Sequence, residues 1–524
     1  MLERAASAEC AAVRTWLRAG LVAAALGAAA LLGGHGVAAA ERSDPPGPDS
    51  GTLRAGPAKP TATARAWRAD RAVPRSIGSQ RTPRLPEVRA ALATPASRIT
   101  APPKPAFPPG PIQSAVLGMQ AFIYGYPLLE FENFRSQAPA LNTLWSLSGF
   151  AEPSVMPIFR PNTDTLYSKA ALDLSGGPVV LSVPDMGDRY FSFQLNDPYT
   201  NVVDYLGTRA TGSGPGTYAI TWAGGPAVAV EGATTVTVPF SNMMLLGRTL
   251  AGDVIDQERA TALMSDYRLT ATGVTASPPP SVAVVAGVAA LDAISAAMGI
   301  NPPPIADSAQ LHALARIGVG AGLRVADAGL GPLSQIAADV GARIAALLLP
   351  LLSNLNQYST ALLNRGWAAP PPAIGDYGTD YQLRAGVFYV GPWANTVDEA
   401  MYSAGLLDQN LAPLSGSNTY VLRFAPGLEP PAQAFWSVTV YDDAGYLVPN
   451  SANRYSVSNS RPEELVRQPD GSIDIILAAQ DPGHPAANWL PVPDGVFSAY
   501  LRIYLPQQAA LDGSWRPPPI VRQE

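Results

Sequence analysis

The 524-residue chain is 47% hydrophobic and 15% charged, and its formal net charge is −6. This composition excludes a highly charged disordered polymer and a coiled coil, and it is sufficient for a sizeable globular core. The acidic balance also argues against a nucleic-acid partner. The chain has 53 prolines, about twice the usual share, so long uninterrupted helices are not expected to dominate the fold.

Residues 1–40 have the pattern of a secretory signal. A basic start is followed by an apolar stretch at residues 20–32 and by three alanines that end at Ala40. We therefore expect cleavage near Ala40 and export to the periplasm, the cell envelope or the medium. An uncleaved membrane anchor is the alternative. The only cysteine, Cys10, lies in this segment, so the mature chain is expected to have no disulfide and no thiolate nucleophile.

Residues 41–111 are rich in proline and arginine and poor in aromatic residues, which predicts a disordered tether. Over residues 41–104 there are 12 Lys and Arg against five Asp and Glu, whereas residues 105–524 have 20 against 34. The basic tether is therefore a candidate for contact with an anionic envelope surface such as lipid headgroups or wall polymers. A soluble spacer is the alternative.

Residues 112–252 are predicted to form an N-terminal β-domain. Apolar residues at helical spacing indicate a helix at 112–124, which should stop before Pro127, with a further helical turn at 128–135. Short apolar runs bounded by Gly, Pro, Asn and Asp then predict strands at 165–172, 179–183, 190–195, 218–222, 227–230 and 234–238. Strands at this spacing are typical of an antiparallel sandwich or barrel.

Residues 253–366 are predicted to form a helical insert or bridge. Ala-rich stretches at 281–298, 308–317 and 333–352 are separated by prolines. Their apolar runs are interrupted by Asp292, Asp339 and Arg343, so a buried or partner-facing helix is favoured over a membrane span.

Residues 367–524 are predicted to form a second β-domain, with strand patterns from Tyr389 and at 420–424, 434–441, 473–477 and 497–504. A weak internal repeat relates 190–197 to 435–442, since both follow the order aromatic, aromatic, Ser, apolar, polar, apolar, polar, Asp. The period of two places the apolar residues of each copy on one face and Ser, Gln, Thr or Asn on the other. The chain is therefore predicted to be mainly β with α segments: two related antiparallel β-sandwich or jelly-roll-like domains plus a helical insert.

Several segments resemble known families. Residues 161–168 (PNTDTLYS), 177–185, 188–194 and 205–212 resemble the domain of unknown function DUF1254, and residues 435–441, 453–456, 487–491 (ANWLP) and 512–517 (DGSWRP) resemble DUF1214. The resemblance covers about residues 114–521 and implies a two-part, β-rich, exported protein. It implies no particular reaction.

The first group of candidate site residues lies around the strand that begins at residue 165. Arginine offers a planar fork to an anion, aspartate is a base or cation ligand, and tyrosine donates to an oxyanion. Asp164, Tyr167 and Arg189 are the catalytic candidates, and Arg160, Asn162, Gln194 and Asp197 are the ligand-binding candidates. The alternative is structural: an Asx turn at residues 162–164 and a local ion pair for Arg189.

The second group of candidates lies on loops of the C-terminal β-domain and comprises Tyr441, Asn453, Arg454, Asn488 and Trp489. Polar and aromatic loop residues often bind ligands. They also close turns and cap the open ends of sandwiches, and the sequence leaves this alternative open.

Motifs of common enzymes are absent from the sequence: it has no Gly-x-Ser-x-Gly elbow, no Walker A loop and only three histidines. No metal site and no cofactor are predicted, although Ca²⁺ at isolated aspartates is not excluded. The function expected is binding of a small or polymeric organic ligand in a polar cleft of the β-domains. Whether the ligand is turned over, and whether the protein oligomerises, are left open. The alternative is a non-catalytic envelope protein that docks partners through the helical insert and the basic tether.

Overall fold

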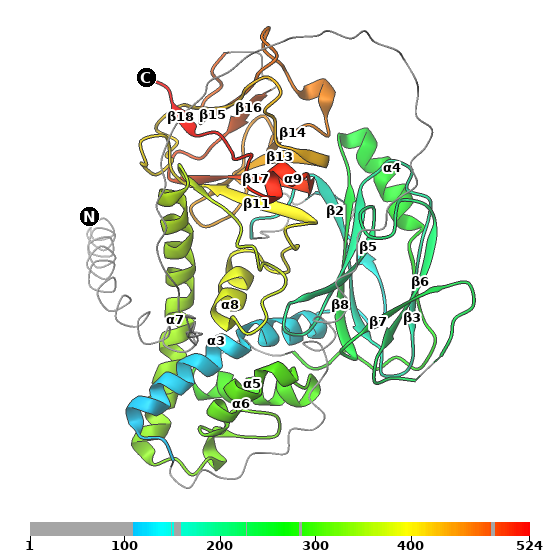
Figure 1. Cartoon of the computed structure of the whole chain (residues 1–524), viewed down its shortest axis with the longest axis vertical. Coiled ribbons are helices and arrows are strands. Elements are labelled where there is room, and N and C mark those ends of the chain that lie inside the picture. Colours follow the sequence, from blue (N-terminus) through cyan, green and yellow to red (C-terminus); the bar gives the residue numbers. More distant parts are fainter. Residues whose placement is uncertain are drawn as a thin grey trace, which may run out of the picture. The chain divides into compact units, whose positions relative to one another are not determined.

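The computed structural model describes residues 108–147, 149–150, 153, 159–226, 228–281, 286–483 and 488–524, all within one compact unit of the chain. The predicted signal segment and nearly all of the predicted tether lie outside these residues. The described part is mainly β with α segments, as the sequence predicted, and contains four sheets (Figure 1).

The N-terminal half contains two sheets. The five-stranded sheet has the order β1-β2-β8-β4-β5 and is antiparallel throughout. Its strands are β1 (Trp145–Ser146), β2 (Thr165–Asp173), β8 (Asn242–Leu250), β4 (Phe191–Asn196) and β5 (Val202–Gly207). The four-stranded sheet has the order β7-β6-β3-β9, with β6 and β7 parallel. Its strands are β7 (Thr234–Val238), β6 (Gly216–Trp222), β3 (Val179–Val183) and β9 (Arg268–Ala271).

The C-terminal half repeats this topology strand for strand. Its five-stranded sheet has the order β10-β11-β17-β13-β14, and its four-stranded sheet the order β16-β15-β12-β18. Every strand number is that of the first half plus nine, and the corresponding pair β15 and β16 is again parallel. The strands are β10 (Trp367–Ala368), β11 (Ala400–Gly405), β12 (Tyr420–Phe424), β13 (Ala432–Asp442), β14 (Ser456–Ser458), β15 (Ile473–Ala478), β16 (Trp489–Pro491), β17 (Phe497–Pro506) and β18 (Ile520–Arg522). The expectation of two related β-domains is therefore confirmed.

Helices precede, connect and follow these strands. They are α3 (Pro111–Ser136), α4 (Val254–Ser265), α5 (Val288–Ile300), α6 (Ser308–Ala315), α7 (Pro332–Leu363), α8 (Tyr381–Val390) and α9 (Gln508–Leu511), with short 3₁₀ turns at Ile305–Asp307, Val325–Asp327 and Pro462–Glu464. Local chemistry sets several of the helix starts. The side chains of Asp253 and Asp380 cap α4 and α8 by accepting backbone N–H bonds, and α3 and α7 both begin with a proline.

The predicted helix end at Pro127 is wrong, because α3 continues through it to Ser136. An internal proline costs a helix about 3 kcal/mol. The next two residues, Leu128 and Leu129, are fully buried in the core, and burial of such side chains contributes roughly 1.5–3 kcal/mol each. Packing therefore outweighs the local penalty. The same holds for α7, which passes Pro350.

Two further predictions are wrong. Residues 228–230 form no strand, and Tyr389 lies in α8 and not in a strand. The pattern also missed the strands β1, β5, β8, β9, β10, β11, β14, β16 and β18. Strand β9 pairs with β3, so the N-terminal β-structure extends past residue 252, where the sequence placed its end.

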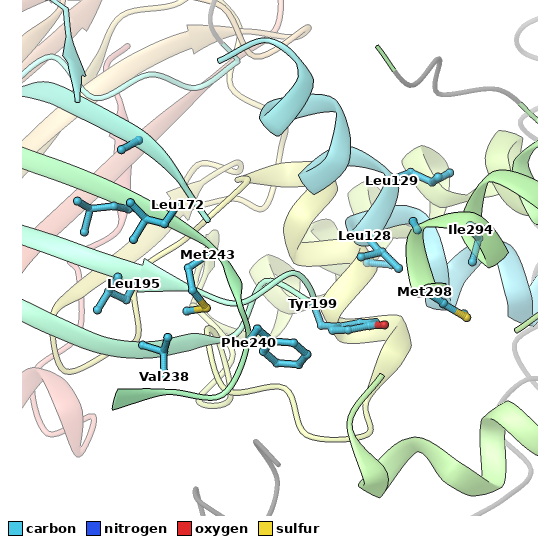
Figure 2. Packing of buried hydrophobic residues seen from close by; sticks show 14 of the residues in the cluster. Leu128, Leu129, Leu172, Leu195, Tyr199, Val238, Phe240, Met243, Ile294 and Met298 are labelled. Atoms are coloured by element: carbon cyan, nitrogen blue, oxygen red, sulfur yellow. The ribbon is translucent and has the colours of Figure 1, made fainter. Parts of the chain in front are cut away.

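Each half encloses its own apolar core between its two sheets. The N-terminal core continues into the helices. Leu172, Leu195 and Met243 belong to the sheet side of this cluster, and Leu128 and Ile294 to the helix side (Figure 2). Helices α3 and α7 approach so closely that a Cβ at Gly341 would lie 2.0 Å from the carbonyl oxygen of Ala115. The helices are thus an integral part of the N-terminal core.

Candidate functional site

The candidate site is built from the faces of the five-stranded sheets that point away from the sandwich cores. The alternation predicted for β4 and β13 is confirmed. Phe193 and Val438 lie in the two cores, whereas Ser192 and Ser437, their neighbours, point to the opposite faces. A period of two keeps this division along each strand.

Both of these faces carry the same row of three side chains across the three central strands. In each row a tyrosine lies opposite an arginine, and the arginine lies opposite a serine. The rows are Tyr167, Arg248 and Ser192 on β2, β8 and β4, and Tyr402, Arg502 and Ser437 on β11, β17 and β13. The two rows occupy equivalent positions in the repeat, so the duplicated topology places two equivalent arginines in the protein.

The two faces contact each other. The ring of Tyr190, the residue before β4, lies 5.3 Å from that of Tyr504 and 5.8 Å from that of Phe435. The Tyr190 hydroxyl also donates to Glu399 Oε1 at 2.8 Å, and Asn162 Nδ2 donates to the hydroxyl of Tyr504. Residues far apart in sequence, from both halves, therefore form one polar and aromatic layer.

The two row arginines are buried, with exposures of 5% for Arg248 and 4% for Arg502. Arg248 Nη1 donates to Gln194 Oε1 at 2.6 Å and to Asn395 Oδ1 at 3.0 Å. Arg502 Nη2 donates to the Tyr441 hydroxyl at 2.6 Å. Among the described residues, no carboxylate forms an ion pair with either guanidinium, although buried charges are normally paired.

The nearby carboxylates already have cationic partners. Glu399 accepts from Arg209 Nε at 2.6 Å, and Asp164 lies 3.6 Å from Arg461 Nη1. Ser456 Oγ also donates to Asp164 Oδ1 at 3.3 Å. The acidic groups around the layer are thus neutralised by other arginines, so the two row arginines give it an excess of positive charge.

Several buried polar atoms of the layer have no hydrogen-bond partner within the described part of the chain. They are Arg502 Nη1, Ser437 Oγ, Thr439 Oγ1, Asn196 Nδ2 and Asp164 Oδ2. The residues Ser437, Thr439, Asn196 and Asp164 are 0% exposed. Ser437 lies directly opposite Arg502, and Thr439 lies two residues further along β13 on the same face of the sheet. An unsatisfied buried polar group costs about 1–3 kcal/mol, so the unpartnered donors of Arg502, Ser437 and Thr439 on the adjacent strands β13 and β17 require an explanation.

Burial also fixes the protonation of the tyrosines. It raises the pKa of Tyr441 to about 12, and it raises the pKa of Tyr504 well above the ordinary value. Both groups therefore remain neutral hydroxyls that can donate. At the half-buried margin of the layer, burial and the charge of Arg248 lower the pKa of Lys169. The Lys169 Nζ lies 6.0 Å from the ring centroid of Tyr167.

Of the residues predicted from the sequence, six lie in or beside this layer: Arg160, Asn162, Asp164, Tyr167, Gln194 and Tyr441. Arg160 stacks its guanidinium 5.0 Å from the ring centroid of Tyr500 and donates to the Val390 carbonyl at 3.1 Å. Asn162 Oδ1 accepts from the backbone N–H of Asp164 at 2.6 Å, so the Asx turn named as the structural alternative is present as well.

The structure does not bring Arg189 or Asp197 into the layer. Arg189 makes a bidentate contact with Asp256, with Nη1–Oδ2 and Nη2–Oδ1 distances of 2.8 and 2.5 Å. This is the local ion pair of the structural alternative. Asp197 accepts from the backbone N–H groups of Tyr199 and Asn201 and so closes the turn after β4. Burial raises the pKa of Asp197 to about 6.

The C-terminal loop candidates other than Tyr441 have local contacts. Asn488 Oδ1 accepts from the N–H of Val466, and its Nδ2 donates to the Val466 carbonyl. Trp489 Nε1 donates to the carbonyl of Ala478 at 2.9 Å. Asn453 adopts a φ of 47°, and Arg454 lies 3.8 Å from Glu464. These contacts match the loop-stabilising alternative.

The row arginines themselves were missed by sequence reasoning. Each is the only charged residue of its strand, in NMMLLGRTL for β8 and FSAYLRIYLP for β17. A lone arginine in a strand with an otherwise uncharged face was the available signal. Among the described residues, no group of three or more His, Cys, Asp or Glu is arranged to hold a metal ion.

Comparison with one solved structure agrees with this architecture. The chain is similar to the crystal structure of the VPA0106 protein from Vibrio parahaemolyticus, with 23% identity, a TM-score of 0.59, and coverage of 78% of this chain and 100% of that one. It also matches an uncharacterised protein from Burkholderia cenocepacia, with 15% identity, a TM-score of 0.38, and coverage of 78% and 94%. No curated protein matches the chain.

Two family models match, and both are described as proteins of unknown function. DUF1254 matches residues 141–271, which include β1 to β9, and DUF1214 matches residues 399–508, which include β11 to β17. These matches confirm the resemblance noted in the sequence. The chain therefore contains one segment that matches the DUF1254 model and one that matches the DUF1214 model.

Proposed function

We propose that the protein binds a small hydroxylated organic anion between the two Tyr-Arg-Ser rows. The observation that supports this most is the group of unpartnered buried atoms Arg502 Nη1, Ser437 Oγ and Thr439 Oγ1. All three can donate hydrogen bonds, and they belong to neighbouring positions of β13 and β17. Unpartnered donors on adjacent strands, one of them a guanidinium without an ion-pair partner, match the needs of a carboxylate or a phosphate or sulfate ester.

The other groups of the layer suggest what else the ligand contains. Asp164 Oδ2 is an unpartnered acceptor, and it would accept a hydrogen bond from a ligand hydroxyl. Tyr167 is half-buried, with Arg248 5.9 Å from its ring centroid, and would pack against the ligand body. These groups suit an acid that also carries hydroxyl groups better than a simple fatty or aromatic acid. A simple acid would leave Asp164 Oδ2 without a hydrogen-bond donor.

Turnover of the ligand is a further step of the same proposal. Asp164 would accept a proton and Tyr167 would donate one, with Arg248 and Arg502 stabilising negative charge. Arg189 has no part in it, because its guanidinium is held by Asp256. We further propose, from the pattern of residues 1–40 alone, that binding takes place outside the cytoplasm.

A thermal-shift screen tests this function. Gluconate, glucuronate, benzoate, inorganic phosphate and neutral glucose are compared on the wild-type protein, on Arg502→Lys, which lacks the forked Nη1 donor, and on Arg189→Gln as a control. We expect a hydroxylated anion to stabilise the wild-type protein and Arg189→Gln, and to have no such effect on Arg502→Lys. Equal stabilisation of wild type and Arg502→Lys by every probe would refute the site.

A further inference from the structure

Helix α7 carries a long apolar stripe that the described part of the chain leaves uncovered. Seven large aliphatic side chains of the helix are 40–71% exposed. They are Leu333, Ile336, Val340, Ile344, Leu347, Leu355 and Leu362. Apolar side chains scattered singly on a surface need no explanation, but a contiguous apolar patch usually marks an interaction site.

The positions of these residues place them on one face of the helix. Counting the half-buried Leu351, the spacing from Leu333 to Leu355 is three, four and four residues, repeated twice. At about 100° per residue, the whole set falls within an arc of roughly 100°. An 11-residue period is close to that of a straight helix, so the stripe runs along the helix without winding around it.

A different face of α7 packs inside the protein. Ala338, Gly341 and Ala345 are buried, and a Cβ at Gly118 of α3 would lie 2.3 Å from the carbonyl oxygen of Ala338. The stripe is therefore not the face that anchors α7 in its own fold. Among the described residues α7 is also the one helix long and apolar enough to cross a membrane by length and composition, with 33% of that window buried.

The charges of α7 favour a protein partner over a lipid surface. Its only charged residues are Asp339 and Arg343, which pair with each other at 2.7 Å. Helices that lie on membranes usually have several Lys or Arg on the polar face, and here the single arginine is neutralised by its neighbour. An uncharged aliphatic stripe complements another uncharged aliphatic stripe.

We infer that two copies of this chain dimerise by packing their α7 stripes against each other about a two-fold axis. Seven large aliphatic side chains that are each 40–71% exposed offer an area on the order of the ~800 Å² per partner of a standard interface. A two-fold axis pairs a surface with itself, and no charged side chain of the stripe opposes that pairing. The interface is independent of the proposed ligand site.

Sedimentation velocity of the full chain over a concentration series tests this inference. The matched pair of variants is Leu347→Glu, 70% exposed on the stripe, and Leu363→Glu, 85% exposed on the same helix but off the stripe. We expect a wild-type dimer whose Kd rises at least 100-fold in Leu347→Glu and changes less than threefold in Leu363→Glu, with both variants folded.

Added salt should leave the dimer intact, because the contact is apolar. Flotation with phosphatidylcholine and phosphatidylglycerol vesicles tests the alternative that the stripe binds a lipid surface. A monomer at every concentration, equal effects of the two variants, or vesicle binding by a monomeric wild-type chain that Leu347→Glu abolishes would each overturn the inference.

Discussion

Replacement of Thr439 by Val tests the proposed ligand site in the polar and aromatic layer, because it should raise the stability of the ligand-free protein and lower its affinity for the ligand. Thr439 is 0% exposed and its hydroxyl has no partner within the described structure. Leaving such a group unsatisfied costs about 1–3 kcal/mol. Val keeps the shape and removes the hydroxyl, so the ligand-free variant should be at least as stable as the wild type and up to ~2 kcal/mol more stable. A hydroxyl that donates to an anion contributes about 1.5–3 kcal/mol, so affinity should fall at least tenfold.

The assay is urea denaturation of the ligand-free protein together with calorimetric titration of whichever anion stabilises the wild type. Thr249→Val is the matched control. Thr249 is as deeply buried and lies beside Arg248 on β8, but its hydroxyl bonds to that of Tyr267 at 2.9 Å and faces the N-terminal core. The control should lose about 1 kcal/mol of stability and keep its affinity. A Thr439→Val protein that is destabilised like the control, with unchanged affinity, would refute the reasoning.

Three further predictions concern single groups. Ser437→Ala should leave the stability of the ligand-free protein unchanged or raise it. It should lower the affinity for the same anion about tenfold, as measured by the same titration; unchanged affinity would remove Ser437 from the site. Gly341→Ala should destabilise the protein by about 1–3 kcal/mol in urea, because the new Cβ would lie 2.0 Å from the Ala115 carbonyl oxygen; a neutral result would show that α3 and α7 separate easily. Burial raises the pKa of Asp197 to about 6. Between about pH 4 and 6, the folded state therefore keeps a proton on this carboxyl group that the unfolded state has already released. Stability should therefore fall as pH rises through this window, by on the order of 3 kcal/mol relative to Asp197→Asn, and parallel pH profiles of the two proteins would contradict this.

The sequence predicted those elements whose signal is local. Strands β3 and β7 appear at the predicted residues because Gly or Pro lies within two residues of both ends of each run. The repeat between β4 and β13 also predicted which side chains point to the cores, since a period of two is a property of the strand itself.

The missed elements depend on contacts that are distant in sequence. Strand β8 lies between β2 and β4 and is buried on both faces, so it shows no alternation to detect. Helix α3 runs through Pro127 because Leu128 and Leu129 fill the core. The partners of Arg248 are 54 and 147 residues away in the sequence, and the partner of Arg502 is 61 residues away. No spacing rule brings such residues together.

Diffraction from a bromide-soaked crystal, with anomalous difference maps, tests the central claim most directly because it requires no knowledge of the natural ligand. The account predicts a bromide ion within hydrogen-bond distance of Arg502 Nη1 and at least one of the hydroxyls of Ser437 and Thr439. An Arg502 guanidinium whose Nη1 is instead bonded to a protein acceptor, with no anomalous peak near β13 and β17, would contradict it.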